Sequence, residues 1–210
     1  MSAEEILAQV AREVSQCTRC ELHRTRKNAV PGEGPANAEI MLIGEGPGFH
    51  ENEQGRPFVG AAGKFLEELL AQAGLKRSDV WIGNVVKCRP PGNRDPLPAE
   101  LSECDDYLER QIKAINPKII ITLGRFSMAK FVPGAKISTE HGQMRKVGNR
   151  FVIPMYHPAA ALHQPKWRPQ ILADFSKLPA QLERAKTALT SGVSTDDEPP
   201  DEEPTQLSLF

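Results

Sequence analysis

The stretch EIMLIGEGPG, residues 39–48, joins a short apolar run to a glycine-rich turn. The run from Glu39 to Ile43 is brief and has no helical spacing, which is typical of a buried strand. Three more runs have the same character and also lead into polar or glycine-containing segments: residues 80–86, 118–123 and 151–155. The sequence therefore predicts four buried strands.

Helical patterns separate the first three of these strands. The segment AGKFLEELLAQAG places its large apolar residues on one stripe and ends at Gly74, and LPAELSECDDYLERQIKAI repeats leucine and isoleucine at similar intervals. A further helical pattern covers about residues 169–190. Alternating strands and helices favour a parallel sheet covered on both faces. We expect an α/β fold with three layers, α/β/α, and a four-stranded parallel sheet, in one domain over residues 1–190.

The residues suited to chemistry follow the strands. They include the turn from Gly44 to Gly48, the segment 87–94, and Tyr156-His157-Pro158. Ligands of open α/β sheets bind at the carboxyl ends of the strands. We expect the functional site at that edge.

Length and composition indicate the setting. With 210 residues, 40% of them apolar, the chain is long enough for one sizeable core. No apolar run approaches the roughly 20 residues that cross a bilayer, and the opening MSAEEILAQV is acidic and amphipathic, unlike a signal peptide. We expect a cytoplasmic monomer without a membrane partner.

The net charge of −1 is unevenly distributed. Six acidic residues between Asp196 and Glu203 contribute −6, so the rest of the chain carries +5. A mildly basic body permits a polyanionic partner such as nucleic acid. The acidic stretch is also proline-rich and lacks apolar periodicity, so residues 191–205 are predicted to be a disordered linker.

Four cysteines raise a question of chemistry: Cys17, Cys20, Cys88 and Cys104, of which the first two form a Cys-x-x-Cys pair. In a reducing compartment such a pair points to metal or redox chemistry. Four thiolates suit a structural zinc or an iron-sulfur cluster, and the spacing does not choose between them. The alternatives are free thiols with two core cysteines, or a thioredoxin-type pair, which the position outside a βαβ unit disfavours.

Three motifs and the cysteine spacing together resemble the family-4 uracil-DNA glycosylases from about Glu4 to Leu182. The motifs are GEGPGFHENEQGRPFVGAAG (44–63), NVVKCRPPGNRDP (84–96) and YHPAAAL (156–162). The resemblance implies that the four cysteines ligate a 4Fe-4S cluster. It also implies a bacterial base-excision repair enzyme, a monofunctional hydrolase that releases uracil from DNA. The segment 91–103 is short and lacks the histidine of a related branch that captures DNA covalently, so we expect ordinary turnover.

The resemblance also implies roles for individual residues. Phe58 would stack on the flipped uracil, and the Asn84 amide would distinguish uracil from cytosine by its donor and acceptor pattern. His157 is the candidate to donate a hydrogen bond to O2 of the departing base. Glu45 and Glu51 compete to position the attacking water and to stabilise the sugar cation.

DNA phosphates need donors of their own. The backbone N–H groups of Gly46 and Gly48 are candidates, and four basic residues could add charge, although each could equally be solvated surface: Arg89, Arg94, Lys166 and Arg168. Leu162 could wedge into the vacated base stack, or it could belong to helix packing.

The chain ends in QLSLF, residues 206–210. This resembles the pentapeptide with which bacterial proteins bind the β sliding clamp, here through Gln206, Leu207, Leu209 and Phe210. Tethering by the linker would raise the enzyme's effective concentration near replicating DNA. The alternative is a tail that folds back onto the domain.

Two rival functions stay open. A redox-sensing iron-sulfur module could bind DNA without cutting it, and a zinc-stabilised nucleotide hydrolase would be colourless. If the protein is a glycosylase, substituting Phe58, Asn84 or His157 abolishes base release while the cluster absorbance persists.

Overall fold

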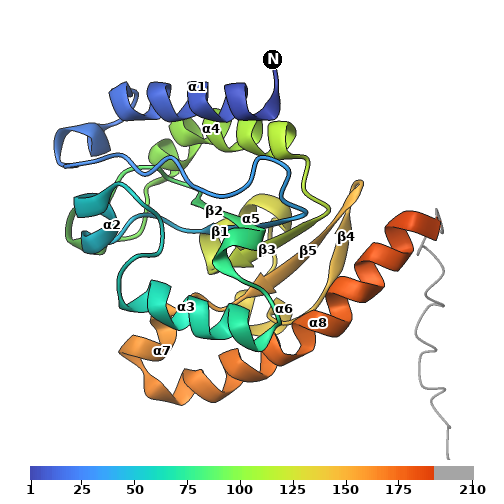
Figure 1. Cartoon of the computed structure of the whole chain (residues 1–210). Coiled ribbons are helices and arrows are strands. Elements are labelled where there is room, and N and C mark those ends of the chain that lie inside the picture. The colour runs from blue at the N-terminus through green and yellow to red at the C-terminus, as the bar shows by residue number, and fades with distance from the viewer. Residues whose placement is uncertain (192–210) are drawn as a thin grey trace, which may run out of the picture.

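The computed structural model describes residues 1–191, in which five strands form one sheet (Figure 1). Their order in the sheet is β2-β1-β3-β5-β4. Their bounds are Ile40–Gly44 (β1), Val80–Asn84 (β2), Ile119–Leu123 (β3), Arg145–Val147 (β4) and Arg150–Met155 (β5). The four predicted strands are therefore present. The predicted linker, residues 191–205, and the predicted clamp-binding peptide, residues 206–210, lie outside the described residues except for Ser191, which is the last residue of α8.

The strand count was predicted one too low. Strands β1, β2, β3 and β5 pair in parallel as expected, whereas β4 runs antiparallel to β5 across a tight turn at Gly148 and Asn149. The fifth strand escaped prediction because Arg145 and Lys146 are exposed on the edge of the sheet, so no apolar run marks it.

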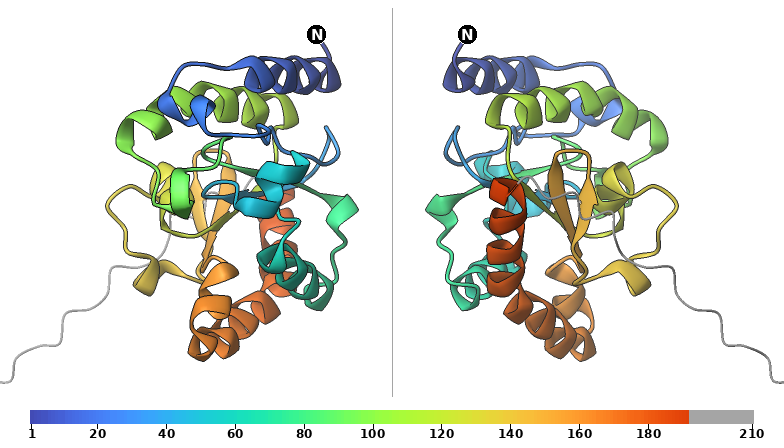
Figure 2. Two further views of the ribbon diagram at one scale, coloured as in Figure 1. Left: turned by 90° about the vertical axis from the view of Figure 1, so that its left-hand side faces the viewer. Right: turned by 90° about the vertical axis from the view of Figure 1, so that its right-hand side faces the viewer.

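Helices cover both faces of the sheet and complete the three predicted layers (Figure 2). Two of them, α3 and α8, pack on one face, and α4 and α5 cover the other. The bounds are Ala3–Gln16 (α1), Phe49–Gln54 (α2), Ala61–Gln72 (α3), Pro98–Ile115 (α4), Arg125–Phe131 (α5), Ile137–Glu140 (α6), Ala159–His163 (α7) and Arg168–Ser191 (α8). Short 3₁₀ turns cover Glu21–Arg24, Arg77–Asp79, Pro91–Asn93 and Pro165–Trp167.

Alternation along the strands divides the core in two. On β1, Leu42 faces α3 and α8, while Met41 and Ile43 face α4. All three side chains are fully buried, as expected for parallel strands covered on both faces.

The amino-terminal helix lies outside these layers. Ser2 and Glu5 form a capping box that starts α1, and Val10 and Val14 pack against Tyr107 of α4. Figure 1 shows α1 lying along α4 on the side away from the sheet. Among residues 1–191, no helix is both long and apolar enough to cross a membrane.

Candidate active site

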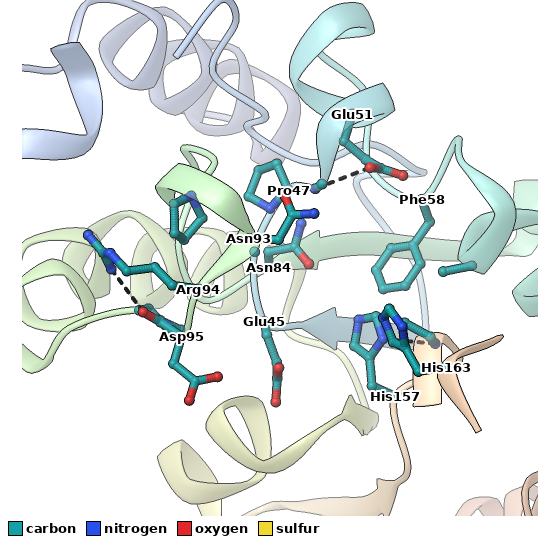
Figure 3. A pocket seen from close by; sticks show the side chains of 16 residues that line it. Glu45, Pro47, Glu51, Phe58, Asn84, Asn93, Arg94, Asp95, His157 and His163 are labelled. Carbon is teal, nitrogen blue, oxygen red and sulfur yellow. Dashed lines mark hydrogen bonds between the residues drawn. The ribbon is translucent and has the colours of Figure 1, made fainter. Parts of the chain in front are cut away.

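A cavity of about 410 Å³ opens at the carboxyl ends of the parallel strands, where the sequence predicted the site (Figure 3). This volume suits a small ligand such as a nucleobase. The lining includes eight residues named from the sequence: Glu45, Gly46, Gly48, Glu51, Phe58, Asn84, Arg94 and His157. Segments that lie far apart in the chain therefore meet in one place.

Asn84, the last residue of β2, lines the cavity and buries a side-chain oxygen. Its side chain is 1% exposed, and Oδ1 has no hydrogen-bond partner within residues 1–191. Burying a lone acceptor costs about 1–3 kcal/mol, so such a group is expected to await a donor. Gly44 makes room for it, because a Cβ at that position would lie 2.4 Å from Asn84 Oδ1.

Phe58 and His157 form one side of the cavity. Their ring centroids lie 5.5 Å apart at an interplanar angle of 25°, and Phe58 is buried. Figure 3 shows the two rings near each other, with Asn84 and Glu45 toward the middle of the view. An aromatic face at the edge of a base-sized cavity can stack on a planar ligand.

The tautomer of His157 follows from its contacts. The Ala159 N–H donates to Nδ1 at 3.1 Å, so in the neutral ring the proton is on Nε2. Burial lowers the pKa of His157 from 6.5 to about 4; the charge of Glu51 acts in the opposite direction, and His163 adds to the lowering. At neutral pH the ring is therefore an uncharged hydrogen-bond donor through Nε2.

The two candidate carboxylates differ in how they are held. Glu51 Oε1 accepts from the N–H groups of Val59 and Gly60, both at 2.9 Å, and Oε2 accepts from Gly48 N–H at 3.1 Å. Those contacts tie α2 to the Phe58 loop. Glu51 therefore already has partners for both of its oxygens.

Glu45 is less constrained. The Phe126 N–H donates to its Oε1 at 3.2 Å, and burial raises the pKa of Glu45 although this backbone contact and Arg125 oppose the rise. Gly124 allows the side chain to reach the cavity, since a Cβ there would lie 2.4 Å from Glu45 Oε1. A half-buried carboxylate in a cleft with a shifted pKa is a candidate for acid-base work.

The basic residues predicted to hold phosphates fall into two groups. Arg94 lines the cavity but pairs with the buried Glu100, and Arg168 pairs with Glu68. Arg89 and Lys166 form no ion pair in the described part of the chain; Arg89 lies over the ring of the exposed Phe49. The predicted wedge, Leu162, is 46% exposed on α7 and does not line the cavity.

Several lining residues were not predicted, among them Asn93, Asp95 and His163. The first two lie in a quoted motif, so their position beside Arg94 was available as a signal. Lys87 was also missed: it is fully buried, and its Nζ donates to Asn84 O at 2.9 Å and to Gln111 Oε1 at 2.8 Å. Its position directly after a strand did not indicate that this charged side chain would be buried.

The four cysteines line one small cavity, together with Arg26, Lys87 and Tyr107. Cys17 caps α1, Cys88 follows β2 and Cys104 lies on α4. Arg26 Nη1 donates to Cys88 Sγ at 3.2 Å, and burial raises the pKa of Cys104 to about 11. Within residues 1–191, no group of three or more His, Cys, Asp or Glu side chains is arranged to hold a metal ion.

Comparison with known proteins agrees with this geometry. Residues 31–182 match the family model of the uracil DNA glycosylase superfamily. The chain therefore belongs to the uracil DNA glycosylase superfamily and, as its relatives show, to its type-4 family.

Several curated relatives carry the name type-4 uracil-DNA glycosylase, and three of them illustrate the similarity. The protein from Archaeoglobus fulgidus is 45% identical over 183 residues, which cover 83% of this chain and 92% of the relative. The protein from Saccharolobus solfataricus is 48% identical over 82% of this chain and 85% of its own length. The Thermotoga maritima protein is 46% identical, with coverages of 76% and 84%.

Proposed function

We propose that this protein is a uracil-DNA glycosylase that flips deoxyuridine out of DNA and hydrolyses its N-glycosidic bond. The observation that carries the proposal is the buried Oδ1 of Asn84, which has no hydrogen-bond partner within residues 1–191, beside the stacked rings of Phe58 and His157. Family membership supports the same substrate.

Uracil is the base that fits the Asn84 amide. Its N3–H can donate to Oδ1, and its O4 can accept from the amide nitrogen, whereas cytosine has a bare N3 and an amino group at these positions. Cytosine would therefore leave the buried oxygen unpaired, and sites of this kind reject such analogues strongly. Phe58 would stack on the ring of either base, so discrimination lies with Asn84.

Cleavage of the glycosidic bond creates negative charge on uracil and positive charge on the sugar, and the cavity contains a side chain that can stabilise each of them. When the bond between N1 and C1′ breaks, both electrons leave with uracil, and negative charge develops on O2. The neutral His157 can donate to that oxygen from Nε2. Glu45 is the better placed of the two carboxylates to orient water toward C1′ and to offset the positive sugar, because the oxygens of Glu51 are already bonded. The water oxygen bonds to C1′, and the proton that the water loses is taken up by the uracil anion, which gives an abasic site and free uracil.

DNA would be held around the mouth of this cavity. Gly46 and Gly48 line it and can present backbone N–H groups, although the Gly48 N–H is shared with Glu51. Arg89 and Lys166, which lack ion pairs in residues 1–191, are better phosphate ligands than Arg94 and Arg168. Leu162 is exposed enough to enter a vacated stack.

The proposed cofactor is a 4Fe-4S cluster, and the four cysteines around one cavity support it. Four sulfur atoms are the complete ligand set of such a cluster, and the Arg26 guanidinium supplies positive charge beside Cys88. Cys17, Cys20, Cys88 and Cys104 would hold it. When bound, the cluster would join α1, the loop after β2 and α4; the glycosylase chemistry assigns it no step.

The proposal extends to the cell. The protein would be a monomeric, cytoplasmic repair enzyme. It would reach replicating DNA through a clamp-binding peptide that consists of Gln206, Leu207, Leu209 and Phe210. The sequence QLSLF supports this partner, after an acidic, proline-rich linker that would act as a tether.

Single-turnover base release tests the function. The substrates are duplexes with one U opposite G, and T opposite G as the control; iron content and visible absorption are measured in the same preparation. We expect brown protein that cleaves at U and leaves T intact. Fully loaded protein that left U untouched would overturn the proposal and favour a DNA-binding sensor.

A further inference from the structure

Phe58 has an unusual backbone conformation. Its φ is +50°, in the left-handed region that residues with a side chain rarely adopt. Gly63 of α3 lies directly against it, since a Cβ there would come 1.9 Å from the Phe58 carbonyl oxygen. Some other group must hold the loop in this conformation, because nothing intrinsic to phenylalanine favours it.

Arg77 makes the contacts that such a task needs. Its Nη1 donates to Phe58 O at 3.1 Å, and its Nη2 donates to Pro57 O. Nε and Nη2 also donate to Glu33 Oε1, at 3.0 and 2.8 Å. Two successive carbonyls and a carboxylate are bound at once, which requires the planar fork of a guanidinium. The Arg77 side chain is 19% exposed, so solvent does not compete freely for these bonds.

Glu33 connects this clamp to the strand that carries Asn84. Its backbone N–H and carbonyl pair with Ile82, at 2.9 and 2.7 Å, in an antiparallel bridge. Ile82 precedes Asn84 by two residues on β2. The loop of Phe58 and the strand of Asn84 are therefore linked through two side chains.

Phe58 and Asn84 lie next to each other on one wall of the cavity, so the distance between their side chains affects which ligand can contact both. A Cβ on Gly44 would lie 2.4 Å from Asn84 Oδ1 and 2.7 Å from the Phe58 ring. We propose that Arg77 and Glu33 are a positioning pair that holds the Phe58 ring at the separation from Asn84 that a flipped uracil requires. The inference rests on the proposed glycosylase function. Neither residue lines the cavity, so their effect is exerted through Phe58.

A double-mutant cycle tests the inference in the full-length, iron-loaded protein. Arg77→Gln is measured alone and in a Phe58→Leu background, by single-turnover uracil release and by DNA affinity. Leucine keeps an apolar side chain against the base, so we expect release in that background to be slow but still measurable. Arg56→Gln is the matched control, because Arg56 binds the same Glu33 carboxylate but is 58% exposed and is not bonded to the two carbonyls. Arg77→Lys tests whether the fork itself is required.

We expect Arg77→Gln to slow uracil release at least tenfold with DNA affinity within twofold, and Arg56→Gln to be near wild type. Arg77→Lys should not rescue the rate. In the Phe58→Leu background, Arg77→Gln should cost less than threefold, because the residue it positions is gone. Equal losses in both backgrounds, or rescue by lysine, would overturn the inference. If Arg77→Gln does not fold, the same comparison is made with Arg77→Lys. We then expect Arg77→Lys to slow uracil release relative to its parent protein when Phe58 is present, and not in the Phe58→Leu background. Wild-type protein that released no uracil would instead overturn the proposed function, and the inference with it.

Discussion

Asn84 and Thr122 each bury a side-chain oxygen that has no hydrogen-bond partner in residues 1–191. Only the oxygen of Asn84 belongs to a residue that lines the cavity. We expect Asn84→Leu, which has a similar shape, to slow uracil release by about 100-fold, or about 3 kcal/mol, because the donor and acceptor for the base are lost. Stability should hold or rise by about 1 kcal/mol, since an unpaired buried group is removed.

Thr122→Val is the control for Asn84→Leu. It removes another buried oxygen that has no partner in residues 1–191, so thermal melting should respond in the same direction while uracil release stays at the wild-type rate. A large loss of stability in Asn84→Leu would contradict the assignment, because it would mean that the amide is structural.

The pH dependence of the reaction should report on Glu45. Burial raises its pKa above the ordinary 4.5, so the carboxylate is lost as pH falls through a value above 4.5. We expect the single-turnover rate to fall along that acid limb, and Glu45→Gln to lower the plateau and remove the limb. His157, with its pKa lowered to about 4, should add no inflection near 6.5.

Glu53→Gln is the matched control for the pH experiment, because Glu53 lies on α2 and pairs with Lys27 outside the cavity. It should keep the wild-type profile. An acid limb that persisted unchanged in Glu45→Gln would assign the titration to another group.

The sequence predicted which residues line the cavity better than it predicted the contacts that each of them makes. Phe58, Asn84 and His157 follow or end recognisable strands or lie in a glycine-flanked motif, so their convergence could be anticipated. The hydrogen bonds of Glu51 could not be anticipated, because its partners are backbone N–H groups on separate turns. The ion pair between Arg94 and Glu100 could not be predicted either, because it depends on the conformation of the folded loop.

Helix α3 is packed against the backbone of the Phe58 loop. Gly63→Ala would place a Cβ 1.9 Å from the Phe58 carbonyl oxygen, so the helix or the loop has to move. We expect a loss of about 1–3 kcal/mol in stability and a slower release of uracil. The comparison is with Lys64→Ala, one residue along on the exposed side of α3, in melting and single-turnover assays. Wild-type behaviour of Gly63→Ala would show that this contact is readily relieved.

The strands and helices with continuous apolar patterns were predictable, and the polar-faced ones were not. Buried β1 is apolar throughout and β3 is apolar except for Thr122, but β4 shows exposed basic residues and pairs with a single neighbour. Its turn did carry a usable signal, since Gly148 and Asn149 between two short extended runs are typical of a hairpin. Helices as short as α6 and α7 have too few turns to show a period.

The cysteine cavity joins the end of α1 to the body of the domain, in addition to the packing of α1 on α4. Cys17 ends α1, and the other three cysteines belong to the body of the domain. Because a cluster bound to the native state stabilises it, we expect iron chelation to lower the melting temperature by about 5 °C or more, for a contribution of roughly 2 kcal/mol in a chain of this size.

Hydrogen exchange should locate that loss. Residues 3–16 should become unprotected on chelation while β1 and β3 stay protected, and Cys17→Ser should reproduce the pattern. Equal melting temperatures with and without iron would contradict a structural role for the cluster.

The proposed clamp contact is separable from catalysis. Every residue assigned to the cavity lies before residue 192, so a chain truncated after Ser191 should release uracil from short duplexes at the wild-type rate. It should lose binding to an immobilised β clamp, and Phe210→Ala in the full chain should do the same. Clamp binding that survived truncation would place the contact elsewhere.

The walls of the cavity come from successive parallel strands, with Glu45 after the first and His157 after the last. A ribosome therefore supplies Glu45, Phe58 and Asn84 long before it supplies His157. A nascent chain that has not yet completed β5 lacks His157, the proposed donor to the departing base, and has an incomplete sheet to hold the rest. Under the proposed mechanism, removal of uracil is therefore a property of finished molecules and not of partial translation products.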